Sequence, residues 1–395
     1  MITMMAQNQK GRNVQPDLQV NHAPAGPRHV VRWPVSPLHD LQLTASFVVG
    51  LAELARSGDI VLDLEILPDR HVAPHVMYWI VRETRSGREC CFAFDVYDRS
   101  DRFDMATLGR ANVYFKRNFS RSGLEAVPQR LRSRIEPAGM TFGCRTRASN
   151  GLLVRAAATS FRAHLAAFGL PGLNSALRRL WQDFNLIRGF PDASVWERTP
   201  DDPVHEQVVF QTRVWTPEPD PAIDRTRVNA ERIALVRALR SAFGSGDLVG
   251  LIHTEFAERI APDALLSRKV SRIEYAQQLR TSLISVNSHG LDGSGGFKIG
   301  ESLAAGVALV SQPFHFELPE PLLPDVNYLP YETPEQCVAQ CRRLLAERSL
   351  ANRLRSANLE YYWRNVQPAA HARQVLARAF SSDESQASPV TGMNG

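Results

Sequence analysis

Residues 288–306, SHGLDGSGGFKIGESLAAG, decide the fold of this chain. Four of the first nine residues are glycines, and the pattern then changes to small and apolar residues with helical spacing. The segment is preceded by the apolar run LISVN (283–287) and followed by VALVSQP (307–313). We therefore predict a strand, a glycine-rich loop, a helix and a second strand, in that order.

This order of elements favours anion binding. In an open parallel sheet, ligands bind at the carboxyl ends of the strands, where glycines let the backbone approach them. The N-terminus of the following helix attracts anions, and Lys298 in its first turn adds a point charge. Glu301, in the same turn, can accept hydrogen bonds from sugar hydroxyls. A site that binds a phosphate beside a sugar is typical of nucleotide binding. The same pattern also occurs without a ligand, and the dinucleotide motif GxGxxG is absent.

Length and charge limit the number of domains and the kinds of binding partner that can be expected. At 395 residues with 44% hydrophobic and 22% charged residues, the chain predicts two globular domains. The formal charge of +5 is mild, and no long basic run supports binding to nucleic acid. Only four of the 46 basic residues are lysines, namely Lys10, Lys116, Lys269 and Lys298. A lysine kept in such an arginine-rich chain hints at a site that needs the smaller group.

The cellular context is expected to be the cytoplasm. The five cysteines are odd in number and form no CxxC pair, as is typical of a reduced protein. The first residues carry no apolar signal region, and no window of 18 residues is uninterruptedly apolar. Peripheral contact with the inner face of a membrane is left open.

Strand-like and helix-like segments alternate through both halves, which predicts an α/β protein with two parallel sheets. The segment 191–206, rich in proline and charge, is the expected linker. Thr333 and Gln336 predict a capped helix start. The expected divisions are a disordered tail (1–27), a first domain (28–200), a second domain (206–365), a crossover helix (366–380) and a second tail (381–395).

The segment GFKIGESLAAGVALVSQP (296–313) resembles the donor-binding segment of GT-B glycosyltransferases. Its residue pattern is closest to that of the exostosin-like lineages. VVFQTRVWTP (208–217) resembles the strand that opens the second domain of that family. NYLPYETPEQCVAQCRRLLAE (327–347) resembles its later strand, loop and helix. EYYWRNVQPAAHARQVL (360–376) resembles its final helix. The resemblance covers roughly residues 206–380.

The resemblance implies a GT-B fold, with two Rossmann-like domains, a cleft between them and a C-terminal helix that crosses back to the first. It implies a nucleotide sugar as co-substrate, with no metal and no other cofactor. Arg213 falls on a position that contacts the donor diphosphate, and Glu301 on the second glutamate of the family motif. The expected donor-binding residues are Arg213, Lys269, His289, Gly293, Gly295, Gly296, Phe297, Lys298 and Glu301.

Two departures from the family pattern stay open. An earlier glutamate of the motif corresponds to Gly293, beside Asp292, which is a candidate substitute. A family lysine after the opening strand has several candidate counterparts, namely Arg225, Arg227, Lys269 and Lys298.

The first half supplies the expected acceptor side. His39, in the loop after the first strand, is the candidate general base, and Asp40 is either its catalytic neighbour or an N-cap. Asp95, Asp98 and Asp101 lie close together after a strand, for hydrogen bonding or loop structure. Lys116 and Arg117 follow another strand and face either an anionic acceptor or the donor phosphates, or form a solvated turn.

The expected function is transfer of a sugar from a nucleotide-sugar donor to an acceptor hydroxyl of a glycan, lipid or small molecule. The alternative is a binding or scaffold protein that keeps the fold without turnover, and no nucleic-acid partner is expected. The sequence leaves open the sugar, the nucleotide, the acceptor, the oligomeric state and whether the anomeric configuration is retained.

Overall fold

The computed structural model describes residues 27–387 except 40, 70–72, 200, 218–223 and 245, with side chains described to residue 381. Residues 1–26 and 388–395, which make up most of the two predicted tails, lie outside the described residues. The last helix, α13 (Pro368–Ala387), continues beyond residue 381, where the second tail was expected to begin.

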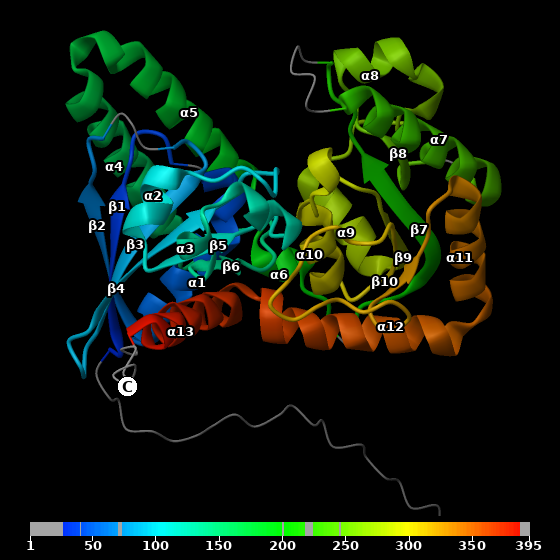
Figure 1. Cartoon of the computed structure of the whole chain (residues 1–395). Coiled ribbons are helices and arrows are strands. Elements are labelled where there is room, and N and C mark those ends of the chain that lie inside the picture. Colours follow the sequence, from blue (N-terminus) through cyan, green and yellow to red (C-terminus); the bar gives the residue numbers. More distant parts are fainter. Residues whose placement is uncertain are drawn as a thin grey trace, which may run out of the picture.

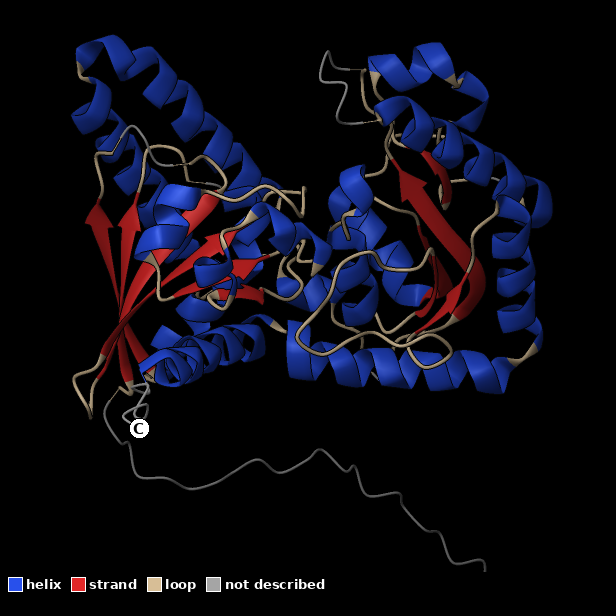
Figure 2. Cartoon of the chain, in the orientation of Figure 1, coloured by secondary structure: helices blue, strands red, loops and turns tan. Residues whose placement is uncertain are grey.

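The first half contains a six-stranded sheet with helices around it (Figures 1 and 2). Its strands in spatial order are β2 (Ile60–Ile66), β1 (His29–Val35), β3 (Val76–Glu83), β4 (Glu89–Asp95), β5 (Val113–Lys116) and β6 (Ile135–Pro137). Its helices are α1 (Leu41–Ser57), α2 (Met105–Arg110), α3 (Gln129–Arg132), α4 (Asn150–Phe168), α5 (Leu173–Gly189) and α6 (Ala193–Trp196). Short 3₁₀ turns cover Ser122–Ala126 and Leu170–Gly172.

The prediction of a fully parallel first sheet is wrong at one strand. β3 runs antiparallel to both of its neighbours, β1 and β4, whereas the β1–β2, β4–β5 and β5–β6 pairs are parallel. The connection from β3 to β4 spans only residues 84–88, which is too short for the crossover that parallel neighbours require. The apolar runs that predicted two-sided burial do not distinguish strand directions.

The second half contains a five-stranded sheet that is parallel throughout. Its strands in spatial order are β11 (Tyr328–Pro330), β10 (Ala308–Ser311), β9 (Ser282–Asn287), β7 (His205–Thr212) and β8 (Val249–Leu251). Its helices are α7 (Arg225–Phe243), α8 (Glu255–Ile260), α9 (Arg272–Thr281), α10 (Phe297–Ala304), α11 (Pro334–Ala346) and α12 (Arg348–Tyr361). Every residue of β9 is buried, as expected for a central strand covered on both faces.

The capping pattern predicted at the start of α11 is present. The Thr333 side chain accepts from the backbone N–H of Gln336, and the Gln336 side chain accepts from the backbone N–H of Thr333. The expected linker, 191–206, is folded in part: it contains α6, whose Trp196 is fully buried and packs edge-on against Tyr275 of α9.

The chain returns to the first half through α12, a single π-helical turn (Tyr362–Val366) and α13 (Figure 1). α13 packs along α1, and its Val375 and Leu376 are buried in the same core as the first sheet. His371 is fully buried, and its Nε2 lies 2.8 Å from the carbonyl oxygen of Ala138. A C-terminal helix that crosses back is part of the predicted GT-B fold class, and that prediction is confirmed in its main features.

A third core cluster joins the two halves. Phe142 of the first half lies 6.1 Å from the ring of Tyr362, and the same cluster contains Val49, Ile299 and Leu303. The two sheets are therefore held relative to each other by packed side chains as well as by the chain connections.

Gly50 allows the closest approach between α1 and α13. A Cβ atom at this position would lie 2.0 Å from the carbonyl oxygen of Pro368 and 2.8 Å from Cβ of Ala372. We predict that Gly50→Ala lowers the free energy of unfolding by about 2 kcal/mol, because overpacking outweighs the gain in helix propensity. Urea unfolding followed by circular dichroism measures this change.

Gly151→Ala in α4 is the matched control, because a Cβ atom there meets nothing within 4 Å. Its free energy of unfolding should be unchanged or rise by up to about 1 kcal/mol. Equal effects of the two substitutions would contradict the packing argument.

Candidate active site

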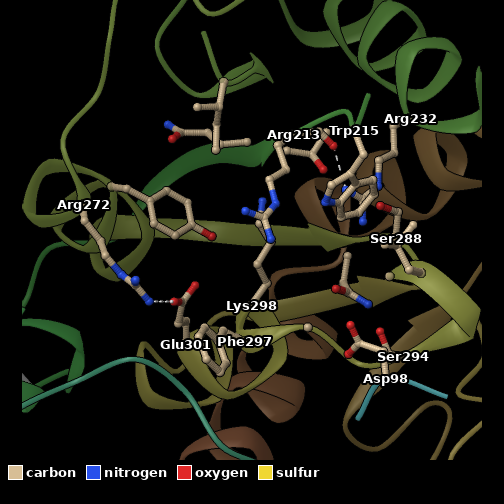
Figure 3. Close-up of a pocket in the computed structure, with 18 of the residues that line it drawn as sticks. Asp98, Arg213, Trp215, Arg232, Arg272, Ser288, Ser294, Phe297, Lys298 and Glu301 are labelled. Carbon is tan, nitrogen blue, oxygen red and sulfur yellow. Dashed lines mark hydrogen bonds and ion pairs between the residues drawn. The ribbon is translucent and has the colours of Figure 1, made fainter. Parts of the chain in front are cut away.

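A cavity of about 420 Å³ opens between the two halves, beside the ends of β7 and β9 (Figure 3). Gln42, Leu43, Asp98 and Arg117 line it from the first half. The lining from the second half comprises Gln211, Thr212, Arg213, Trp215, Arg232, Ile252, Val270, Ser271, Arg272, Tyr275, Asn287, Ser288, Gly290, Leu291, Ser294, Gly296, Phe297, Lys298 and Glu301. The glycine-rich segment thus meets the cleft at the carboxyl end of β9, as predicted.

The glycine-rich loop is folded into a compact turn. The backbone N–H of Gly290 donates to the carbonyl of Ser294, and the N–H of Ser294 donates to Leu291. Gly295 faces Phe316 so closely that a Cβ atom would lie 2.3 Å from the ring. This side chain packing explains the need for glycine at 295 independently of any ligand.

The N-terminus of α10 faces the cleft. Its N-cap is Gly296, which offers no side chain to accept hydrogen bonds from the first turn. Gly296, Phe297 and Lys298 all line the cavity. An eight-residue helix that begins here directs its positive end and uncapped N–H groups toward the cavity, where an anion would be stabilised.

Lys298 is the least satisfied cation of this region. Although the residue as a whole is partly exposed, its Nζ atom is buried and makes no hydrogen bond to any described residue. The nearest rings are those of Tyr275 and Phe210, whose centroids lie 5.7 and 5.9 Å from Nζ. Burial, together with the charges of Arg232 and Arg213, lowers the pKa of Lys298 to about 7, although Glu301 acts in the opposite direction.

Arg232 is a site residue that the sequence analysis did not single out. It lies on α7, is buried, and donates to the carbonyls of Arg213 (2.8 Å) and His289 (2.7 Å). Burial and the charge of Arg213 lower its pKa to about 9. In the sequence it is one of many arginines on an amphipathic helix, so only its three-dimensional position distinguishes it.

Trp215 stands beside this cation cluster. The guanidinium of Arg232 lies 4.2 Å from the ring centroid, and that of Arg213 lies 5.5 Å away. Asn229 fixes the Trp215 backbone, since its side chain accepts from the N–H and donates to the carbonyl. Figure 3 shows Lys298 extending toward Arg213, with Trp215 and Arg232 to the right of this pair. The predicted pair Arg213 and Lys298 is thus brought together.

Glu301 lines the cavity but is already paired. Its Oε1 lies 3.0 Å from a guanidinium nitrogen of Arg272, whose side chain sits among the rings of Phe190, Trp196 and Phe297. Burial raises the pKa of Glu301, and the charges of Arg272 and Lys298 oppose that rise. Arg272, at the first position of α9, was not predicted.

Three other predicted donor residues lie at the edge of this region. Lys269 is exposed and is absent from the cavity lining, although its neighbours Val270 and Ser271 belong to it. His289 turns its ring away, and its Nε2 lies 2.6 Å from the carbonyl of Pro313. Gly293 has a φ of +69°, and a Cβ atom there would lie 3.2 Å from the His315 ring.

The structure does not place the predicted catalytic base in the cleft. His39 is only 1% exposed, with Nε2 3.5 Å from Asp183 and Nδ1 3.3 Å from the carbonyl of Ser36. Its ring is thus enclosed between the end of β1 and α5, and it is absent from the cavity lining. This position does not fit the predicted proton transfer from an acceptor. Asp40 lies outside the described residues.

The predicted acceptor-side residues separate into two pairs. Lys116 and Asp95 are fully buried and joined at 2.9 Å, and Tyr114 also donates to Asp95. Burial lowers the pKa of Lys116, against the opposing charge of Asp95. This pair is enclosed in the first domain, which corrects its predicted place at the acceptor side. Arg117, in contrast, lines the cavity and pairs with Asp98.

Asp101, the third carboxylate of that group, pairs with Arg99 at 2.8 Å. Within the described part of the chain, no group of three His, Cys, Asp or Glu side chains is placed to hold a metal ion. No helix among the described residues combines the length and apolar character needed to cross a bilayer.

A comparison with protein families finds one match in the second half. Residues 232–377 match the model of a family described as "Glycosyl transferase-like". The glycosyltransferase resemblance of the C-terminal half is therefore confirmed over that segment, which contains Arg232, Arg272, Lys298 and Glu301. No curated protein sequence matches the chain.

Among solved structures, an alpha-glucosyltransferase in complex with UDP-glucose and DNA has 8% identity, and an alpha1,3-fucosyltransferase with GDP has 10%. The chain covers 100% of the first and 92% of the second, aligning over 89% and 92% of its own length, each with a TM-score of 0.40. A UDP-N-acetylglucosamine 2-epimerase of Listeria monocytogenes has 12% identity and a TM-score of 0.32 over 73% of this chain. The chain spans only 64% of that epimerase.

The unpaired ammonium of Lys298 should destabilise the fold. We predict that Lys298→Met raises the free energy of unfolding at pH 6 by roughly 1–3 kcal/mol, because a buried unsatisfied donor is removed. The folded-state pKa near 7 is below the ordinary value of 10.5, so the unfolded wild type binds more protons between these limits. The free energy of unfolding of the wild type therefore rises with pH between about 7 and 10.5. The stability difference between Lys298→Met and the wild type becomes smaller over the same range.

Urea unfolding at pH 6 and pH 9 measures both effects. Lys269→Met is the matched control, since Lys269 is exposed and its replacement should change little at either pH. A Lys298→Met variant that is less stable than the wild type at pH 6 would contradict the conclusion that the Lys298 ammonium is buried without a hydrogen-bond partner.

Proposed function

We propose that the chain transfers a sugar from a nucleoside-diphosphate sugar to an acceptor hydroxyl. The observation that carries this proposal is the convergence of Lys298, Arg232 and Arg213 on the uncapped N-terminus of α10. A buried ammonium without a partner calls for an anionic ligand. A diphosphate satisfies the three cations and the helix N-terminus together, and the family match of this half supports the same class.

In this proposal, the bond between the anomeric carbon and the diphosphate oxygen breaks, and a bond to the acceptor oxygen forms. The products are the glycoside, the nucleoside diphosphate and the proton of the acceptor hydroxyl. Negative charge grows on the departing diphosphate, so cations already positioned around it stabilise the transition state more than the ground state. Lys298, Arg232 and Arg213 supply that charge, with α10 behind them.

The remaining polar groups are assigned by position. Glu301, held by Arg272, faces the donor sugar or the ribose, where its carboxylate accepts hydrogen bonds from hydroxyls. Asp98 and Arg117 are the charged residues that the first half contributes to the cavity lining, and in this proposal they meet the acceptor. The proposed location is the cytoplasm.

A nucleotide screen tests the proposal. We expect one of UDP, GDP, CDP or dTDP, or its sugar conjugate, to raise the thermal unfolding midpoint, because a ligand that binds only the folded state stabilises it. Arg232→Gln and Lys298→Met should each weaken that ligand about tenfold or more, since each loses a charged contact. Calorimetric titration gives the affinities.

Lys269→Met serves again as the control and should keep wild-type affinity. Turnover of the conjugate that binds, compared with that of Glu301→Ala, then separates an enzyme from the binding-protein alternative. Absence of stabilisation by every nucleotide and conjugate would refute the donor site, and binding without any turnover would favour the scaffold alternative.

Proton uptake provides an independent check. At pH 8, Lys298 is largely neutral because its pKa is about 7, and a bound diphosphate should raise that pKa and draw a proton from the buffer. Calorimetry in two buffers of different ionisation enthalpy should show uptake of up to about one proton. Lys298→Met should bind without uptake, whereas uptake unchanged in this variant would assign the proton to another group.

A further inference from the structure

The α4–α5 hairpin carries an apolar stripe that faces solvent. Leu177, Trp181 and Phe184 recur at the i, i+4 and i+7 positions of α5, and their exposed fractions are 48%, 68% and 39%. Leu170, in the turn between α4 and α5, is 82% exposed. Single exposed apolar side chains are common on protein surfaces, whereas a contiguous row of large ones is typical of an interaction site.

The stripe is additional to the face by which α5 is attached. Ala176 and Ile187 are buried on an adjacent face of the helix, and α5 packs against α4. Asp183, also on that side, is buried next to His39. The fully buried contacts of α5 therefore lie on a different face from Leu177, Trp181 and Phe184, which keep much of their surface exposed.

The exposed charges of the hairpin itself are all positive. Residues 150–189 contain five arginines, at positions 155, 162, 178, 179 and 188, and a single acidic residue, Asp183, which is buried. Arg178 is adjacent to Leu177, and Arg188 continues the stripe one turn beyond Phe184. Apolar side chains bordered by arginines fit a lipid interface, where the rings enter the acyl boundary and the guanidinium groups meet anionic headgroups.

We propose that this face of the α4–α5 hairpin binds the surface of an anionic lipid bilayer. The charge pattern favours lipid over a second copy of the chain, because a symmetric contact would set the arginines of one copy against those of the other. It favours lipid over nucleic acid because Leu170, Leu177 and Phe184 would stay in water against a phosphate backbone.

The position of the hairpin relative to the cleft suggests what membrane binding would do. In Figure 1, the tip between α4 and α5 stands beyond the carboxyl ends of β1 and β2. Gln42 and Leu43, at the start of α1 after β1, line the cleft. A chain bound through this face would hold the cleft near the bilayer and give it access to an acceptor carried by a lipid. Only this last consequence depends on the proposed function.

Flotation of the full chain with vesicles tests the proposal without any assay of turnover. We expect binding to vesicles of phosphatidylcholine mixed with phosphatidylglycerol, much weaker binding to phosphatidylcholine alone, and loss of binding at high salt. The double variant Leu177→Gln/Trp181→Gln should reduce partitioning at least about tenfold. Arg178→Gln/Arg188→Gln should reduce it by about fivefold per arginine, with mixed vesicles only.

Two matched controls exclude general effects. Trp363→Gln removes a half-exposed tryptophan from the turn before α13, and Arg342→Gln/Arg353→Gln removes the same charge from exposed positions of α11 and α12. Both should bind as the wild type does, and circular dichroism should show that all variants fold. Equal losses in a control and its matched variant would overturn the proposal.

The wild type and the same variants also distinguish a bilayer from other partners. No wild-type binding to the mixed vesicles at low salt overturns the proposal. Self-association in solution that is lost in Leu177→Gln/Trp181→Gln, without vesicle binding, assigns the face to a second copy and overturns it too. Retardation of RNA or DNA that depends on Arg178 and Arg188, again without vesicle binding, has the same result.

Discussion

Repulsion among three cations that line one cavity is the constraint on which the candidate site depends. The charges of Arg232 and Arg213 lower the pKa of Lys298, and the charge of Arg213 lowers the pKa of Arg232, so such an arrangement costs free energy in the absence of an anion. The fold tolerates it because Arg232 donates to two backbone carbonyls and rests on Trp215, while Glu301 partly offsets the charge of Lys298. The cost is concentrated on Lys298, whose Nζ has no hydrogen-bond partner among the described residues.

The scaffold behind these cations is closely packed. β9 is buried throughout its length, and α10 packs its inner residues in the core shared by both halves. The α1–α13 contact and the Phe142–Tyr362 contact hold the first sheet against this core, so that Arg117 and Asp98 reach the same cavity as Lys298. Preorganised charge is effective only when neighbouring groups cannot relax around it, and close packing provides that condition.

Local patterns predicted the parts of the molecule that depend on neighbours in sequence. The capped start of α11, the strand-loop-helix order around Lys298 and the alternation of elements all follow from periodicity and turn chemistry. The direction of β3 and the role of Arg232 could not be predicted in this way. Arg232 binds the carbonyl of a residue 57 positions away, and Lys116 is enclosed by an aspartate 21 positions away. Burial and partners of this kind are properties of the tertiary fold.

The departure at Gly293 from the family pattern has a physical basis in the backbone. Its φ of +69° lies in the left-handed region, where a glutamate is strained, and any Cβ atom would press against the His315 ring. Asp292 shares this conformation, with a φ of 54°, and neither residue lines the cavity. The conformation of the loop and the His315 ring therefore disfavour a glutamate at position 293. Among the residues that line the cavity, the acidic ones are Asp98 and Glu301, which pair with Arg117 and Arg272, whereas Lys298 has no hydrogen-bond partner among the described residues.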